Sequence, residues 1–176
     1  IDEAHHLYKP DNERDYGSEA IELLLQVMEN QRDDLILIFA GGKSKIDGFF
    51  DSNPGISSRI GNHVDFKDYD SKDLIDITKY LLTNENRYKY TPDSIAILQH
   101  YIDQLKTFPA FANARTLKVL VNQLLAFQAI RVEDTLAKKG SIDYDSLVTI
   151  RPEDFNYFTP DDFINIIGSE DVKLYS

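Results

Sequence analysis

The most constraining feature of this 176-residue sequence is a short, uninterrupted apolar run at residues 35–40, Leu-Ile-Leu-Ile-Phe-Ala, which ends in two glycines. Such a run is typical of a parallel strand that is buried on both faces, because helices cover both sides of a parallel sheet. The preceding residues 18–31 place apolar side chains at helical spacing, with Ser18 as the expected N-cap. A helix followed by a buried strand predicts a doubly wound α/β sheet, with ligands beyond the carboxyl ends of its strands. We expect residues 1–68 to belong to such a sheet.

The pattern changes after residue 68, and residues 69–139 predict helices alone. Three helix starts follow one another at Ser71, Thr91 and Asn113, and a glycine at position 140 is expected to end the long third helix. The fold class expected for the whole chain is therefore α/β followed by all-α.

Composition excludes several classes of partner. The chain has 30 acidic and 19 basic residues, for a formal charge of −11, and such a field repels nucleic-acid phosphates. No apolar stretch is long enough to span a bilayer, so neither nucleic acid nor membrane is an expected partner. The absence of cysteine excludes disulfides and thiolate metal sites. The sequence begins inside a motif, so we expect any targeting segment to lie upstream.

Asp2 and Glu3 form the strongest local motif. ATP hydrolysis needs one carboxylate to hold the metal and an adjacent one to orient the attacking water. Neighbouring residues at a strand end point in different directions, so Asp2 can face Mg²⁺ while Glu3 faces the γ-phosphate. An ordinary acidic pair is the alternative. The letters DEAH also match a helicase motif, but no Ser-Ala-Thr follows the next strand and the chain is acidic.

Two arginines and two histidines are further candidates. Arg59 in a short loop can stabilise transferred phosphate in a neighbouring subunit, and Arg115 near a helix start can meet phosphate oxygens. Taken alone, each arginine is better interpreted as a solvated surface side chain. His5 and His6 suggest a metal, but neighbours on an extended chain diverge and no third ligand has suitable spacing. We interpret the histidines as local packing.

The order of these features matches the AAA+ plan of Walker B motif, sensor 1 strand, arginine finger, helical lid and sensor 2. The strings NERDYG, LLQVMENQRDD and SNPG with SRI carry a closer similarity. Over about its first 155 residues the chain resembles the CbbX-type family of red-lineage Rubisco activases, and more distantly sporulation and type VII secretion ATPases.

This resemblance implies a domain division and a set of site residues. Residues 1–68 would be the C-terminal part of the AAA+ α/β subdomain and 69–155 the helical lid, with 156–176 an unassigned extension. The Walker A and pore loops are expected upstream. The implied roles are a metal ligand at Asp2, catalysis by Glu3 and Arg59, and nucleotide binding by Arg115 and Ser44.

The resemblance also implies a function for the full-length protein. The family forms hexameric rings that use ATP and Mg²⁺ to thread a peptide tail of the Rubisco large subunit, which releases an inhibitory sugar phosphate. Ribulose bisphosphate acts as an effector in bacterial members. The implied location is the plastid stroma or the bacterial cytoplasm. The family's long lid helix is arginine-rich, whereas this chain keeps Lys118 and Arg131. A remodeller of another client and a non-hydrolytic interaction module are the alternatives.

Overall fold

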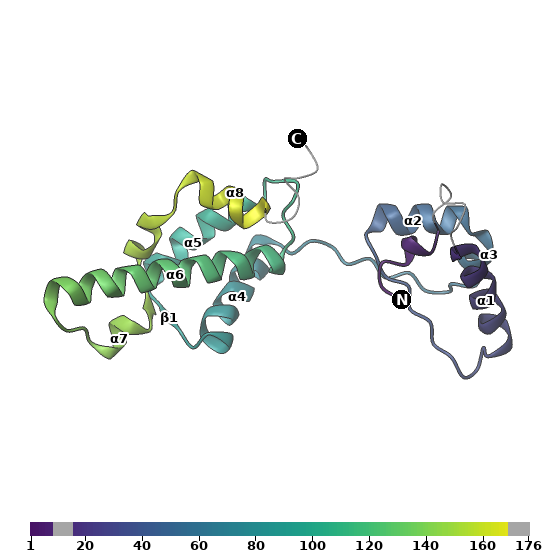
Figure 1. Cartoon of the computed structure of the whole chain (residues 1–176), viewed down its shortest axis with the longest axis horizontal. Coiled ribbons are helices and arrows are strands. Elements are labelled where there is room, and N and C mark those ends of the chain that lie inside the picture. The colour runs from purple at the N-terminus through teal and green to yellow at the C-terminus, as the bar shows by residue number, and fades with distance from the viewer. Residues whose placement is uncertain (9–15, 169–176) are drawn as a thin grey trace. The chain divides into compact units, whose positions relative to one another are not determined.

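The computed structural model describes residues 1–8 and 16–168, so the last eight residues of the predicted extension lie outside it. The chain divides into two compact units, Ile1–Lys67 and Asp68–Ser176, and each is described by itself (Figure 1). Within the described residues, no helix combines the length and the apolar character that crossing a bilayer requires.

Within residues 1–8 and 16–67, the first unit holds four helical elements around a small core. They are the 3₁₀-helix η1 (Ala4–Leu7) and the α-helices α1 (Gly17–Asn30), α2 (Lys43–Ser52) and α3 (Pro54–Ser57). The helix predicted over residues 18–31 is confirmed to within one residue. Its N-cap position is held by Tyr16 without a side-chain hydrogen bond, so the predicted cap at Ser18 is wrong. Three buried side chains form the core of this unit: Ile21, Phe49 and Ile56.

Residues 35–40 run extended and pair with the start of the chain. The amino group of Ile1 donates to the carbonyl of Ile38 at 2.7 Å, and the Ala40 N–H donates to the Ile1 carbonyl at 2.9 Å. In a parallel pair, one residue bonds to the two residues that flank the residue opposite to it. Ile1 therefore lies opposite Phe39 in parallel register.

The predicted burial of this segment on both faces is not observed in the chain as described. Phe39 packs on the core of the first unit, but Ile36 and Ile38 are 87% and 71% exposed, and no regular strand forms. A central parallel strand is buried by a strand on each side and by helices on both faces. Within the described residues the segment pairs on one side only, and a doubly wound sheet is not formed.

The second unit is a helical bundle built around one long helix. Its elements are α4 (Ser71–Tyr80), the π-helix η2 (Leu81–Glu85), α5 (Pro92–Leu105), α6 (Ala114–Lys139), α7 (Tyr144–Leu147), the 3₁₀-helix η3 (Pro152–Tyr157) and α8 (Pro160–Gly168). The predicted start at Thr91 is confirmed, because its hydroxyl accepts from the Ser94 N–H. Gly140 ends α6 in the left-handed region at φ 71°, which favours glycine.

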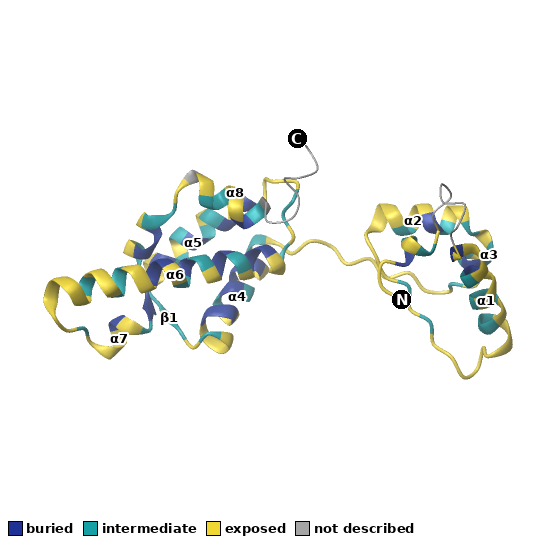
Figure 2. Cartoon of the chain, in the orientation of Figure 1, coloured by how far each residue is buried: buried dark blue, intermediate teal, exposed yellow. Residues whose placement is uncertain are grey.

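The core of the second unit follows from helical periodicity. Buried positions are concentrated along α4, α5 and α6 (Figure 2). Leu74 on α4, Leu98 on α5 and Leu120 on α6 are buried and belong to one continuous cluster. This bundle therefore closes an apolar core within the described residues.

A short parallel sheet joins two distant segments of this unit. Strand β1 (Lys89–Tyr90) pairs with β2 (Thr149–Ile150), with Lys89 opposite Thr149. The Lys89 ammonium donates to Asp145 Oδ1 at 2.7 Å. This hydrogen bond and its charge raise the pKa of Lys89 and lower the pKa of Asp145. The sheet thus ties the segment before α5 to the segment after α7.

The described part of the predicted extension packs on the bundle. The Phe163 ring of α8 stacks on Tyr101 of α5 with centroids 5.0 Å apart, and Phe158 lies at the same distance from Tyr101. Ile166 is buried in the bundle core. The partial burial of Tyr101 itself raises the pKa of its phenol. Residues 156–168 therefore add apolar cover to the helical unit.

Candidate functional site

Asp2 and Glu3 lie at the end of the paired segment and begin a tight turn. The Glu3 N–H donates to Asp2 Oδ1 at 3.0 Å, and the next residue, Ala4, is buried and donates to the Ala40 carbonyl at 3.0 Å. Glu3 adopts the left-handed region at φ 46° and ψ 46°, which is uncommon for a residue other than glycine. Both carboxylates are exposed, so this turn can present two adjacent carboxylates to a hydrated cation.

Ser44 and Arg59 lie elsewhere in the same unit. Ser44 is exposed in the first turn of α2, which packs against η1. The Arg59 guanidinium donates to the Gly55 carbonyl at 2.9 Å and to Glu29 of α1 at 3.0 Å. Within the described residues, neither side chain contacts the Asp2–Glu3 turn through a hydrogen bond or ion pair. Arg59 is exposed, so its pairing with Glu29 is readily exchanged.

Arg115 belongs to the second unit. It is the second residue of α6 and is exposed, and its guanidinium has no hydrogen bond or ion pair within residues 1–8 and 16–168. A helix N-terminus carries free N–H groups and a positive dipole end. Arg115 is therefore positioned, with the start of α6, to donate to an anionic group.

Asn113 fixes the start of α6 in a way that sequence reasoning missed. We predicted it as the residue that opens the helix, but its side chain does not cap α6. Its amide nitrogen donates to Asp68 Oδ1 at 2.7 Å, and its amide oxygen accepts from the Tyr69 N–H at 3.2 Å. Its backbone has φ 50°, a costly conformation for a residue other than glycine. The first residues of the second unit are thus tied to the helix that carries Arg115.

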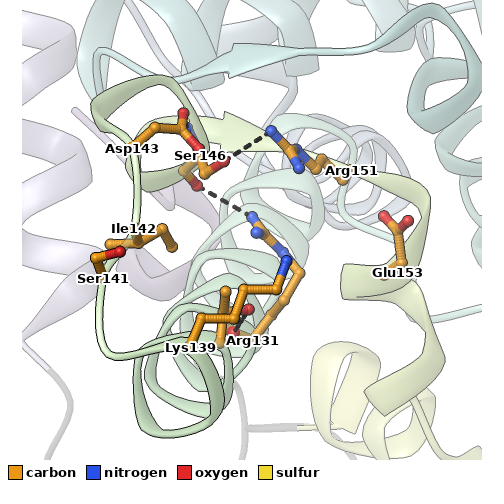
Figure 3. Close-up of a pocket in the computed structure, with 9 residues that line it drawn as sticks. Arg131, Lys139, Ser141, Ile142, Asp143, Ser146, Arg151 and Glu153 are labelled. Carbon is orange, nitrogen blue, oxygen red and sulfur yellow. Dashed lines mark hydrogen bonds between the residues drawn. The ribbon is translucent and has the colours of Figure 1, made fainter.

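A cavity of about 550 Å³ lies near the C-terminal end of α6. Figure 3 shows Arg131 and Lys139 of α6 on one side of it, with Ser146 and Arg151 on the segments that follow. Arg151 donates to the Ser146 hydroxyl at 2.9 Å. Carboxylates from Asp143 and Glu153 also line the cavity, so positive charge does not dominate it.

Arg131 is a structural centre beside this cavity. Its guanidinium pairs with Asp154 and donates to the Thr149 carbonyl at 2.9 Å. The two charged side chains are 11% and 0% exposed, respectively. A buried charge must be paired in this way. Arg131, one of the two cations that the sequence retains on the lid helix, therefore holds η3 and β2 against α6.

His5 and His6 lie together with Glu3, which corrects the prediction that neighbouring histidines diverge and lack a third ligand. The two residues lie on the turn of η1 and not on an extended chain, and their ring centroids are 4.2 Å apart. His5 Nδ1 lies 3.2 Å from Glu3 Oε2. Ligand atoms of all three residues lie within 4.8 Å of one another. The sequence signal was present in EAHH, but its meaning depended on a tight turn.

Residues 70–163 match the family model of the AAA lid domain, and this match covers more than half of the chain. The chain therefore belongs to the AAA lid domain family and is the C-terminal portion of an AAA+ protein.

The relatives of the chain define its group more closely. It is 51% identical over 154 residues to a protein CfxQ homolog of Guillardia theta, covering 88% of this chain and 52% of the relative. It has the same identity and coverage with the chloroplastic ribulose bisphosphate carboxylase/oxygenase activase of Cyanidioschyzon merolae. Protein CbbX of Cereibacter sphaeroides is 46% identical over 154 residues, covering 88% of this chain and 49% of the relative. The resemblance to CbbX-type proteins is confirmed, and the chain spans about half the length of these relatives.

Proposed function

We propose that the full-length protein is an ATP-driven protein remodeller and that this chain supplies part of its hydrolysis machinery. The observation that carries the proposal is the Asp2–Glu3 pair, which is exposed directly after Ile1 in parallel pairing with residues 38–40. Ligands of parallel α/β sheets bind at this end of the strands. Membership of the AAA lid family supports the same interpretation.

The donor set of the turn fits Mg²⁺, which prefers oxygen ligands and keeps several of its waters. Asp2 would hold the ion, and Glu3 would accept a proton from the attacking water. When bound, Mg²⁺ would neutralise part of the charge that develops on the phosphates. In this proposal Ser44 helps to position the γ-phosphate.

The two arginines would stabilise charge on the transferred group. Arg115 donates to phosphate oxygens beside the positive end of the α6 dipole. Arg59 leaves Glu29 and reaches the nucleotide held by a neighbouring subunit. The cost of releasing Arg59 is small, because exposed ion pairs contribute about 0–1 kcal/mol. This role of Arg59 requires a ring, and we propose a homo-oligomeric hexamer.

We further propose that residues 35–40 are a strand of a doubly wound parallel sheet in the full-length protein. The parallel pairing of Ile1 with Phe39 supports this, and so does the exposed pair Ile36 and Ile38. Apolar side chains that are exposed here are expected to be covered by a further layer of the full-length protein.

The client we propose is the Rubisco large subunit, with release of an inhibitory sugar phosphate and ribulose bisphosphate as effector. The name of the Cyanidioschyzon merolae relative, a chloroplastic carboxylase/oxygenase activase, supports this client and a plastid stroma location. A bacterial cytoplasm is the alternative location. A related remodeller with a different client is the second candidate. It is favoured by the internal pairing of the lid cations, Lys118 with Glu85 and Arg131 with Asp154.

The experiment that tests hydrolysis is the Glu3→Gln variant of the full-length protein. Glutamine keeps the shape of the side chain but cannot accept the proton, so nucleotide binding should remain while turnover falls by about 10²–10⁴-fold. Binding is measured with a fluorescent nucleotide and turnover by phosphate release. Turnover equal to that of the parent would remove Glu3 from the role of base.

A further inference from the structure

We propose that Glu3, His5 and His6 form a zinc-binding site. Two imidazoles and one carboxylate are the ligand set of a common class of three-ligand zinc sites, in which water takes the fourth position. The chain contains no cysteine, so no thiolate competes for the ion. The site is distinct in chemistry from the Mg²⁺ ligand proposed at Asp2, because Mg²⁺ selects oxygen ligands and imidazole favours zinc.

The contact between His5 and Glu3 has the spacing of two ligands on one ion. His5 Nδ1 lies 3.2 Å from Glu3 Oε2, yet this nitrogen is buried and has no hydrogen-bond partner in the described part of the chain. With bonds of about 2.0–2.2 Å, two ligands of a tetrahedral zinc stand roughly 3.3 Å apart. A metal ion bound by both atoms would give His5 Nδ1 the partner that it lacks.

The local backbone brings the three side chains to one side of a single turn. Glu3 adopts its left-handed conformation immediately before η1, and η1 then carries both imidazoles. Backbone strain of this kind is often found at functional sites. Gly41 adjoins the turn, and a Cβ at that position would lie 3.5 Å from His5 Nδ1.

The site is open to solvent on the side of its other ligands. The His5 side chain is 15% exposed, whereas that of Glu3 is 52% exposed and His6 is exposed. An ion can therefore reach the buried nitrogen past the carboxylate. The third ligand needs a small rotation, since the ligand atoms lie within 4.8 Å of one another.

Zinc in this site would regulate the proposed ATPase. A Glu3 carboxylate bound to zinc cannot accept a proton from water, so occupancy would stop turnover. This consequence rests on the proposed function, whereas the binding site itself does not. The site would make hydrolysis sensitive to the concentration of free zinc.

The test is a titration of the full-length protein with Zn²⁺ against a chromophoric chelator, without nucleotide. Zinc should bind, and His6→Asn should weaken binding at this site by more than the roughly 10–100-fold that even outer partners of a metal site contribute. His63→Asn and His100→Asn are the matched controls, because both histidines are exposed and lie outside the site. Their affinity, and that of Asp2→Asn, should equal that of the parent.

Two results would overturn the site: no zinc binding, or binding that His6→Asn leaves unchanged. Because the titration contains no ATP, its outcome is independent of the proposed hydrolysis. In the full-length protein, Zn²⁺ should inhibit ATP turnover at the concentration at which it binds. His6→Asn should shift that inhibition to higher zinc by the same factor as the affinity. Binding without this parallel shift would contradict the regulatory role.

Discussion

The two units of this chain differ in how completely they bury their apolar side chains. The helical unit encloses a continuous cluster that includes Leu74, Leu98 and Leu120. The first unit buries the trio Ile21, Phe49 and Ile56, and it exposes most of the apolar run at residues 35–40. A helix satisfies its own backbone hydrogen bonds and needs cover on one stripe, whereas a parallel strand needs neighbours on both edges and both faces.

The difference teaches where each unit obtains its stability. The helical unit obtains it from contacts within its own sequence. The first unit holds its extended segment through a few bonds to Ile1 and Ala4 and through one half-buried face. Its exposed side chains and carboxylates are the features that belong to function in our proposal. The helical unit holds the larger apolar core, and the first unit contains most of the residues that we propose to act in hydrolysis.

Separating the units should produce the largest effect. Residues 68–176 alone should unfold in one cooperative transition, because their core is closed within the described residues. Residues 1–67 alone should show none, because the small core of Ile21, Phe49 and Ile56 cannot offset the conformational entropy of about 1–2 kcal/mol per residue. Thermal melts followed by circular dichroism measure both. A cooperative melt of residues 1–67 would break the comparison.

Breaking the buried ion pair of the helical unit should come next. Arg131→Met leaves the Asp154 carboxylate buried without a cationic partner, so the free energy of unfolding should fall by about 3–5 kcal/mol. Lys118→Met is the control, because its pairing with Glu85 is solvent-exposed and worth about 0–1 kcal/mol. Denaturant titration measures both. Adding Asp154→Asn to Arg131→Met removes the unpaired charge and keeps an acceptor for the Arg151 N–H, so it should recover stability, and a further loss would contradict this account of the pair.

Truncating an apolar side chain should have opposite consequences in the two units. Leu120→Ala opens a cavity in the core and should cost about 2–5 kcal/mol of the free energy of unfolding. Ile36→Ala removes a side chain that is 87% exposed, so its effect should lie within about 0.5 kcal/mol. Equal losses in chemical denaturation of this chain would show that residue 36 is buried.

The smallest effect is a pH dependence at the start of α7. The Ser146 hydroxyl and N–H donate to Asp143, which lowers the pKa of Asp143 in the folded chain. The stabilisation is therefore present above the unfolded pKa of about 3.9 and is lost as pH falls through the lower folded value. Asp143→Asn keeps an acceptor but does not titrate. The stability difference between parent and variant should shrink as pH falls below about 4, and a constant difference would contradict the assignment.

The helices were predictable because their signals are local. The Thr91 cap, the Gly140 stop and the apolar stripe of residues 18–31 each depend on neighbours a few positions apart. The apolar run at residues 35–40 indicated an extended segment, but its burial depends on strands and helices beyond its own sequence. The sequence of residues 35–40 alone does not show whether those covering strands and helices are present.

The candidate site was partly predictable for the same reason. Asp2 and Glu3 are recognisable because they are adjacent in a known order of motifs. The grouping of His5 and His6 with Glu3 arises from a left-handed residue that no periodicity announces. The bond from Asn113 to Asp68 spans 45 positions and has no sequence signature. Pairings of this length follow from the fold and not from spacing.

The most direct test of the account uses mixed rings of the full-length protein. Arg59→Ala and Glu3→Gln subunits should each hydrolyse ATP poorly. If Arg59 acts on the nucleotide of a neighbour, some interfaces in a mixed ring pair an intact Glu3 with an intact Arg59. Because such a finger contributes roughly 10³–10⁵-fold in rate, even a few complete sites should be visible in phosphate release.

Arg115→Ala is the control in the same assay. Its defect lies in the site of its own subunit, so mixing it with Glu3→Gln should restore nothing. The account predicts recovered turnover for the Arg59→Ala and Glu3→Gln mixture alone. A mixture that forms mixed rings, verified by mass spectrometry, yet stays as inactive as either parent would contradict it.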